Sequence, residues 1–443
     1  MKAATAEETR ARVAAAPTPA REARPRWWWV EPTVWTERML AALDERERVP
    51  VWYALMDKVY RANNLVAAWG TVQANKGAAG VDRQSVAAFA AHAEQYLAEL
   101  HQALRTGAYQ AQAIRRCHIP KEGTSATRPL GIPTVKDRVV QTALKHVLEP
   151  IWEARFHPSS HGFRPGRSCK DALREVDRLL QAGSVWVVDA DIQAYFDSID
   201  QVKLLKDVKG VIADGAVLRL VEQYLHQGVL EEGRVWTPEY GTPQGAVISP
   251  LLANIYLHPV DVALGDAGHQ HVRYADDLVI LCRSREAAEA ALTLLRELLA
   301  ARGLTLHPEK TRIVDAREPG GFDFLGYHFE RGKHWPRKKA EQRWRTRIRQ
   351  MTRRTNGQSM AMIIARVNVV TRGWYEYFKH SYRTTFPTLD GWVRMRLRSI
   401  LRKWHRQSGR GRGWDHQRWP NEYFTALGLF TMTAAQATAC QSR

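Results

Sequence analysis

Between about residues 36 and 110, apolar residues recur every three to four positions. The pattern runs through "ERMLAALDERER", "VWYALMDKVYRANNLVAAWGTVQAN" and "VAAFAAHAEQYLAELHQALRTG", and the turn-like "KGAAGVD" (76–82) separates the last two. This spacing predicts amphipathic helices that each bury one face. The folded part of the chain is therefore expected to begin with a helical region.

The pattern becomes mixed between about 111 and 330. Short apolar or alternating runs, "AIRRCHIP", "SVWVVDADI" and "HVRYADDLVILC", are typical of strands, and the last is typical of a hairpin. Helical runs separate them, and further short strands are expected in "LTLHPEKTRIV" and "GFDFLGYHFE". Strands separated by helices predict an α+β fold, in which an antiparallel sheet is backed by helices.

The two ends of the chain differ from this middle part. Residues 1–25 are rich in Ala, Glu, Arg and Pro, and we expect residues 1–35 to form a disordered tail. The tail includes three consecutive tryptophans, Trp27–Trp29, to which the pattern assigns no role. From about 337 onward the pattern is helical again, with a linker-like stretch at 406–414. A chain of 443 residues is long enough for two or three packed modules.

The net charge of +19 is concentrated near the C-terminus. Residues 331–443 hold 25 Lys+Arg and 5 Asp+Glu, whereas residues 1–330 hold 40 and 41. The same quarter holds 7 of the 16 tryptophans, interleaved with arginines, which is typical of a surface that neutralises phosphates and stacks on bases. A solvated helical face with buried tryptophans is the alternative. Because so much like charge repels itself without a polyanion, we expect this quarter to bind nucleic acid.

Cysteine usage and hydropathy argue against several other classes. The four cysteines lie far apart without a CxxC or Cys/His cluster, which argues against a zinc ribbon, a zinc-bound nuclease domain or a disulfide scaffold. No apolar run approaches the roughly 18 to 20 residues that span a bilayer, and the N-terminus has no signal-peptide core. We expect a cytoplasmic protein with reduced thiols and no membrane contact.

Four aspartates stand at the ends of two predicted strands. Asp189 and Asp191 share one face of the first strand by alternation, and Asp276 and Asp277 occupy the turn of the hairpin about 85 residues later. Taken alone, aspartates at a hairpin turn are more often turn formers than a site. If the two strands are neighbours, however, three or four carboxylates converge, and divalent cations must neutralise them.

Oxygen ligands without His or Cys favour Mg²⁺. Two such ions, about 3.5 to 4 Å apart, activate a 3′-hydroxyl and stabilise the pyrophosphate leaving group in nucleotidyl transfer. A glycosidase acid/base pair is the alternative, but it would leave the basic C-terminal quarter without a task. The residues therefore favour metal-dependent phosphoryl transfer.

A series of short blocks resembles one enzyme family. "YADD" (274–277) and "DIQAYFD" (191–197) resemble the palm of reverse transcriptases, and further blocks resemble the group II intron-encoded branch in the same order along the chain. These are "NKGAAGVD", "RPLGIPTVKDRVVQ", "HGFRPGRS", "TPQG" followed by "SPLLANIYLHPVD", "LHPEKT" and "FDFLGY". The resemblance implies a right-hand polymerase in which residues 36–330 form the fingers and palm.

The resemblance also implies roles for individual residues. Asp191, Asp276 and Asp277 match the catalytic, metal-binding carboxylates, with the backbone carbonyl of Ile192 as a further ligand, whereas Asp189 is expected to be structural. A bulky Phe196 matches the steric gate that rejects a ribose 2′-hydroxyl. The other expected nucleotide contacts are Lys121 and Arg128 on the triphosphate, Gln244 in the "GTPQG" bend, and Lys310 as the proton donor to pyrophosphate.

The C-terminal quarter resembles the maturase part of the same family. "NVVTRGWYEYFKHSY" (368–382) looks like the maturase motif, domain X, and "RWPNEYFTALGLFTM" (418–432) is similar to the ends of these proteins. The resemblance implies a helical thumb over residues 331–405, which binds structured RNA, and a basic nucleic-acid-binding segment over 406–443. The expected template and RNA contacts are Phe163, Arg164, Arg345, Arg349, Trp374 and Tyr375.

The expected partners are the intron RNA, an RNA template, a DNA primer or target, and dNTPs with Mg²⁺. Whether the protein is a monomer or a dimer stays open. Because no nuclease block follows the maturase-like part, second-strand cleavage is not expected, and insertion would need another source of primer, such as a replication fork.

Two rival functions stay open at this point. One is a reverse transcriptase of a defence system, retron, diversity-generating element or domesticated host system, although "TPQG" argues against the diversity-generating type and the maturase-like tail argues against retrons. The other is a polymerase-dead RNA-binding splicing factor, against which the intact Asp191, Asp276 and Asp277 argue.

Overall fold

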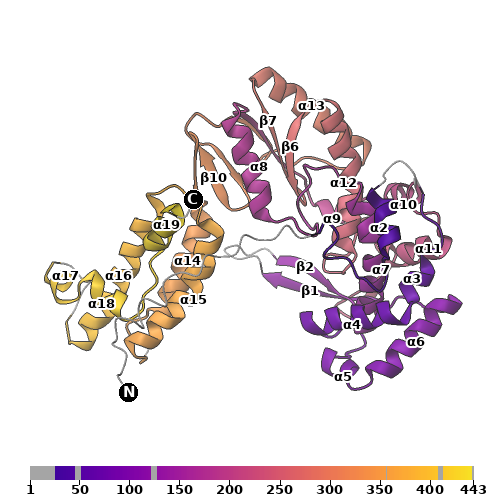
Figure 1. Ribbon diagram of the computed structural model, residues 1–443, viewed down its shortest axis with the longest axis horizontal. Helices are drawn as coiled ribbons and strands as arrows, with labels where there is room; N and C mark the ends of the chain where they lie inside the picture. The colour runs from indigo at the N-terminus through magenta and orange to yellow at the C-terminus, as the bar shows by residue number, and fades with distance from the viewer. Residues whose placement is uncertain (1–24, 45–50, 121–126, 356, 408–412, 442–443) are drawn as a thin grey trace, which may run out of the picture.

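The computed structural model describes residues 25–44, 51–120, 127–355, 357–407 and 413–441. Figure 1 shows that the helices and sheets up to β11 form one body, and that the last helices, from α14 onward, form a second body beside it. No helix in these ranges is both long and apolar enough to cross a membrane.

The long helix α7 (Val135–Glu153) is the centre of the first body. It is buried on almost every side, and its N-terminus is capped by Thr134, whose hydroxyl accepts a hydrogen bond from the backbone N–H of Asp137. Three helices from the N-terminal region pack against it, as their apolar spacing predicts: α3 (Met56–Tyr60), α4 (Ala62–Asn75) and α6 (Ala93–Thr106). The short helix α5 (Val86–Ala90) packs on α4 and α6, and α2 (Glu37–Asp44) comes before them in the chain.

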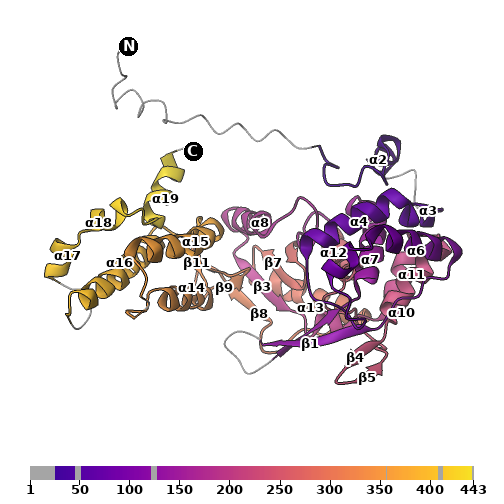
Figure 2. The same ribbon diagram turned by 90° about the horizontal axis from the view of Figure 1, so that it is seen from below.

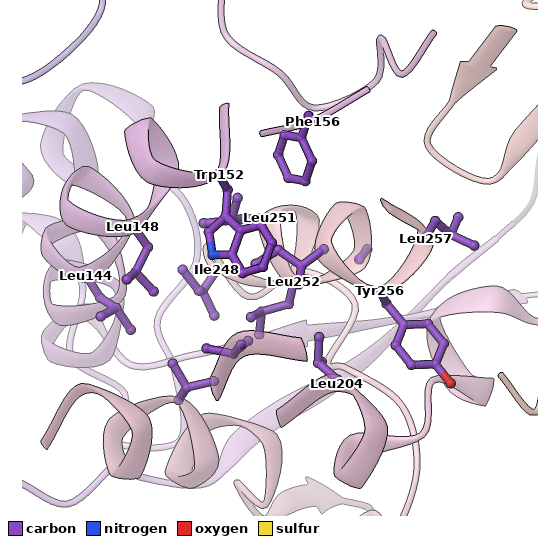
Figure 3. Close-up of a cluster of buried hydrophobic side chains, with 14 of the residues drawn as sticks. Leu144, Leu148, Trp152, Phe156, Leu204, Ile248, Leu251, Leu252, Tyr256 and Leu257 are labelled. Atoms are coloured by element: carbon purple, nitrogen blue, oxygen red, sulfur yellow. The ribbon is translucent and has the colours of Figure 1, made fainter. Parts of the chain in front are cut away.

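The core continues from α7 to the helix α12 (Ser249–Asp266). Figure 3 shows Leu148 and Trp152 of α7 close to Leu251 and Leu252 of α12, all of them buried. Three further helices lie in this part of the chain, namely α9 (Tyr195–Ser198), α10 (Gln201–Lys209) and α11 (Gly215–Leu225).

The palm sheet has four antiparallel strands in the order β6-β7-β3-β8. The strands are β3 (Trp186–Asp191), β6 (Gln270–Tyr274), β7 (Asp277–Cys282) and β8 (Arg312–Asp315). Side chains alternate between the two faces: Val188 and Ile280 join the core with α7, α12 and α13 (Arg285–Ala301), whereas Val187 and Val279 pack with α8 (Cys169–Gln181) on the other face. Both faces are therefore covered, and the expected α+β fold is confirmed.

A second sheet, the fingers sheet, has the order β2-β1-β4-β5. Its strands are β1 (Ile114–Pro120), β2 (Thr127–Ile132), β4 (Val229–Glu231) and β5 (Arg234–Trp236). The strands β1 and β2 pair in antiparallel register, with Arg116 opposite Gly131. Lys121, which was expected to contact the triphosphate, falls between them and lies outside the described residues.

Three short strands lead into the thumb. They form a sheet in the order β11-β10-β9, with β9 (Phe322–Phe324), β10 (Tyr327–Glu330) and β11 (Lys333–Pro336). Tyr327 packs against Phe378 of the thumb, and its hydroxyl donates to the carbonyl of Tyr377 at 2.7 Å. This small sheet therefore joins the palm to the thumb, as Figure 2 also shows.

In the part of it that the structure describes, the thumb consists of helices and the turns between them. The long ones are α14 (Lys338–Met351), α15 (Met360–Phe378) and α16 (Thr385–Trp404), followed by α17 (Trp414–Arg418), α18 (Asn421–Ala426) and α19 (Met432–Gln441). Phe424 and Met432 are fully buried in one core with residues of α14 to α16. The expectation of a separate segment over 406–443 is therefore wrong for its described part, which completes the thumb core.

The predicted disordered tail is also too long. Residues 25–35 form turns that pack on the first body, and Trp35 is 2% exposed. Its ring N–H donates to the carbonyl of His146 in α7 at 2.9 Å, and its ring lies edge-on to Trp52. A composition poor in large apolar residues predicted disorder, but the tryptophans supply enough apolar surface to anchor this stretch.

Candidate active site

The pairing of β3 with β7 brings the predicted carboxylates together. Asp191, the last residue of β3, lies directly opposite Asp277, the first residue of β7. Tyr274 pairs with the same Asp277 across β6 and β7, so that only Ala275 and Asp276 form the turn. Ala275 has a φ of +59°, a conformation that two-residue hairpin turns often require and that alanine adopts rarely.

The carboxylates repel one another. Desolvation of the carboxyl group, together with the charges of Asp276, Asp191 and Asp189, raises the pKa of Asp277 to about 6, although the residue as a whole is exposed. Burial, helped by Asp191, also raises the pKa of Asp276. These aspartates therefore resist full ionisation together unless a cation lies among them.

Basic side chains partly offset this repulsion. Lys310 Nζ lies 2.7 Å from Asp191 Oδ2, and Arg312 Nε lies 3.4 Å from Asp189 Oδ2. These residues line a groove of about 390 Å³, which Arg337 also borders. Arg312 and Arg337 were not predicted as site residues, because a single arginine at the start of a strand or before a helix is ordinarily a surface charge.

The donor set fits hard cations such as Mg²⁺. Asp191, Asp276 and Asp277 provide only oxygen ligands, and they carry more negative charge than Lys310 neutralises. Ile192 is buried and lies opposite Leu306 in an isolated β-bridge. The two hydrogen bonds of this bridge are donated by His307 N–H to the Asp191 carbonyl and by Gln193 N–H to the Thr305 carbonyl. Neither of them uses the carbonyl of Ile192. Across the described ranges, no three His, Cys, Asp or Glu side chains lie close enough together to form a ready-made metal site, so these carboxylates would have to draw closer around a cation.

Two of the nucleotide contacts expected from the sequence, Arg128 and Gln244, contact each other. Arg128 Nε donates to Gln244 Oε1 at 3.2 Å, and Gly131 N–H donates to the Gln244 carbonyl at 2.6 Å. Gly245 has a φ of +106°, and a Cβ there would lie 2.4 Å from the carbonyl oxygen of Gly131. The "GTPQG" bend therefore needs glycine to pack this closely on β2.

Phe196 lies on the other side of the same bend. Its carbonyl accepts a hydrogen bond from Thr242 N–H at 2.8 Å, and its half-buried ring meets the edge of Phe163 at 6.4 Å between ring centroids. Phe163 is 45% exposed and has a φ of +58°. The bend thus contacts Arg128 through Gln244 and Phe196 through Thr242.

The expectation that Arg164 contacts the template is wrong. Arg164 is 6% exposed, and its guanidinium makes two hydrogen bonds to Glu153, at 2.7 and 2.8 Å. It also donates to the carbonyls of His157 and Ser160, both at 2.8 Å. A buried arginine with these partners cannot reach a nucleic acid, and its task is to hold the loop after α7.

Two of the expected RNA contacts in the thumb pack in or against its core. Tyr375 is 4% exposed, so the expectation that its ring faces RNA is wrong, whereas Trp374 is half-buried and packs between Trp344 and Phe378. The two expected arginines lie on the outer side of the same core. Arg345 and Arg349 stack over the ring of Trp392 at 4.8 and 5.6 Å, and Arg349 is exposed.

Comparison with known proteins identifies the family to which the chain belongs. Residues 119–329 match the model of the family "Reverse transcriptase (RNA-dependent DNA polymerase)", and residues 341–419 match that of "Group II intron, maturase-specific domain". The group II intron-encoded protein LtrA of Lactococcus lactis subsp. cremoris is 38% identical over 213 residues, which are 48% of this chain and 35% of LtrA. The chain thus matches about a third of the length of that relative.

Two other relatives match over a longer part of this chain. The COX1/OXI3 intron 1 protein of Saccharomyces cerevisiae is 29% identical over 377 residues, which cover 71% of this chain and 44% of that protein. Protein YkfC of Escherichia coli K12 is 31% identical over 346 residues, which cover 69% of this chain and 86% of YkfC. With both domain types matched in order, the chain belongs to the family of group II intron-encoded reverse transcriptases that carry a maturase-specific domain.

Proposed function

We propose that this protein is an RNA-directed DNA polymerase that uses Mg²⁺ to copy RNA into DNA. The observation that carries the proposal is the placement of Asp191 opposite Asp277, next to the turn that holds Asp276. These three carboxylates, with the carbonyl of Ile192, would hold the ions, which when bound activate the primer 3′-hydroxyl and neutralise the leaving pyrophosphate.

The chain's own side chains would handle the nucleotide. Arg128 and Gln244, with Lys121, would bind the triphosphate of the incoming dNTP. Phe196 would exclude a ribose 2′-hydroxyl, because its backbone is bonded to the "GTPQG" bend and its ring lies edge-on to Phe163. Lys310, which already lies beside Asp191, would donate a proton to the pyrophosphate as it leaves.

We propose in addition that the thumb binds group II intron RNA and assists splicing and retrohoming. In the described ranges, exposed basic residues of α14 such as Arg347 and Arg349 lie outside its aromatic core, where they can reach phosphates. The protein would then act in the bacterial cytoplasm, on intron RNA and on a DNA target. An intron RNA encoded around the gene, recognised by its domain V hairpin, is expected; a flank without one would leave a defence or host reverse transcriptase.

A primer-extension assay tests the polymerase proposal. The protein is expected to extend a DNA primer on an RNA template with dNTPs and Mg²⁺, and Asp276→Ala should abolish extension. Asp57→Ala, which removes an exposed carboxylate of α3 far from the turn in sequence, is the matched control and should extend normally. Failure of the wild-type protein, or full activity of Asp276→Ala, would contradict the proposal.

A further inference from the structure

A buried arginine, Arg273, binds the backbone of the Ala275–Asp276 turn. Arg273 of β6 is 2% exposed, and its guanidinium pairs with Asp261 of α12 through two bonds, Nη2–Oδ2 at 2.6 Å and Nε–Oδ1 at 2.8 Å. Burial disfavours the charge on Asp261, but Arg273 outweighs it and holds the pKa of that carboxyl well below its usual range. The pair is therefore fully ionised at neutral pH.

The remaining N–H groups of Arg273 reach the turn and its support. Nη1 donates to the carbonyl of Ala275 at 2.9 Å and to Asn254 Oδ1 at 3.0 Å, and Nη2 donates to Ser160 Oγ at 2.7 Å. All five guanidinium N–H groups thus have an acceptor, and one of these acceptors belongs to the residue just before Asp276. An isolated structural ion pair would not need that contact.

The backbone of the loop that contains Ser160, residues 159–162, packs against the same turn. Arg273 N–H donates to Ser159 O at 2.9 Å, and His161 N–H donates to Arg273 O at 2.8 Å. Gly162 then lies so close that a Cβ on it would be 2.3 Å from the backbone nitrogen of Ala275. Asn254 completes the support, because its Nδ2 donates to the carbonyl of Gly162 at 2.8 Å.

From this arrangement we infer that Arg273 is a positioning residue for the reaction, and that it acts by fixing the Ala275–Asp276 turn between Asp261 and the loop at Gly162. The inference rests on the proposed polymerase function, since it assigns a task toward Asp276 and Asp277. Displacing a reacting group by about 1 Å can cost about 100-fold in rate, which is the effect expected when this support is lost.

Two variants test the role by different routes. Arg273→Lys keeps the charge next to Asp261 but has three N–H groups on one nitrogen, so it cannot serve all the acceptors. Gly162→Ala leaves the Arg273–Asp261 ion pair intact, but its Cβ would clash with the backbone nitrogen of Ala275 and displace the turn. The controls are Arg302→Lys, which alters another palm ion pair, that with Asp207, and Gly70→Ala, whose Cβ would meet nothing within 4 Å.

The measurements are kcat and KM for dNTP on an RNA template with a DNA primer, the Kd for that duplex, and the melting temperature. Each test variant should lower kcat about 100-fold, with KM and Kd within threefold of wild type, whereas the controls stay within threefold in all three. A kcat within threefold of wild type in a folded Arg273→Lys or Gly162→Ala protein would overturn the inference. A variant in which kcat decreases and the Kd for the duplex increases by the same factor would overturn it as well.

If Arg273→Lys fails to fold, Gly162→Ala decides by itself. An inactive wild-type protein would refute the polymerase proposal and this inference together. An active wild-type protein with fully active variants would refute this inference alone, so the two failures can be told apart.

Discussion

Asp191 and Asp277 face each other across β3 and β7, although 85 positions separate them in the chain. Asp276 follows in the adjoining turn, and Lys310 Nζ lies 2.7 Å from Asp191. The cross-strand neighbours are thus two like charges, a pairing that destabilises a sheet unless something offsets it. This unfavourable pairing lies at the end of the sheet where we propose the catalytic site, and a bound cation would offset it.

The destabilisation caused by the charge on Asp277 should be measurable in metal-free protein. The pKa of Asp277 in the folded protein, about 6, exceeds its ordinary value, so ionisation destabilises the fold as pH rises through this range. In EDTA, Asp277→Asn is expected to raise the free energy of unfolding at pH 8 by about 1 kcal/mol, since solvent screens an exposed carboxylate. Urea unfolding at pH 8 and pH 4.5 checks this, with Asp57→Asn as control. A gain that is absent at pH 8, or larger at pH 4.5, would argue against the assigned repulsion.

Lys310 is expected to matter for the chemical step and not for folding. Lys310→Ala removes the proposed proton donor, so the rate of nucleotide addition should fall about 10² to 10⁴-fold. The ion pair with Asp191 is exposed, so stability should change by less than about 1 kcal/mol. Single-turnover kinetics and urea unfolding measure the two effects. Lys203→Ala removes a comparable exposed ion pair with Asp200 and should leave the rate unchanged.

Phe196 should decide between deoxyribose and ribose. Phe196→Ala is expected to weaken discrimination against ribonucleotides by about tenfold or more, because the ring that blocks the 2′-hydroxyl is gone. The measurement is the ratio of kcat/KM for a dNTP and for the matching rNTP. An unchanged ratio would show that another group forms the gate.

The basic face of the thumb should give a steep dependence of RNA binding on salt. The logarithm of the affinity should fall linearly with the logarithm of salt concentration, and Arg349→Ala should reduce the slope by about 1. Tyr375→Phe is the control, because that residue is 4% exposed in the thumb core. Filter binding between about 50 and 200 mM salt tests this. Affinity that does not change with salt would remove the role given to the thumb.

The sequence allowed the carboxylate site to be predicted because its signals are local. Alternation places Asp189 and Asp191 on one face of a strand, and a tight turn between apolar runs predicts the hairpin that carries Asp276. That the two strands are neighbours is a non-local fact. No local pattern contains it, and the family resemblance supplied it.

Side-chain direction was the part that sequence could not provide. Arg164 was expected to face the template, yet Glu153 of α7 draws it inward. Trp374 and Tyr375 stand in a basic segment, but the composition of a helix does not tell which of its rings enter the core. Arg273 was overlooked for the same reason, since its partner Asp261 comes from another element.

The most direct test of the account is single-nucleotide addition by the wild-type protein and by Asp191→Asn, on an RNA template with a DNA primer and Mg²⁺. Asp191 is the residue that joins the two strands into one site. The wild-type protein is expected to add the templated dNTP, and Asp191→Asn to do so at least about 100-fold more slowly with template binding unchanged. Equal rates for the two proteins would contradict the claim that Asp191, Asp276 and Asp277 form a single catalytic centre.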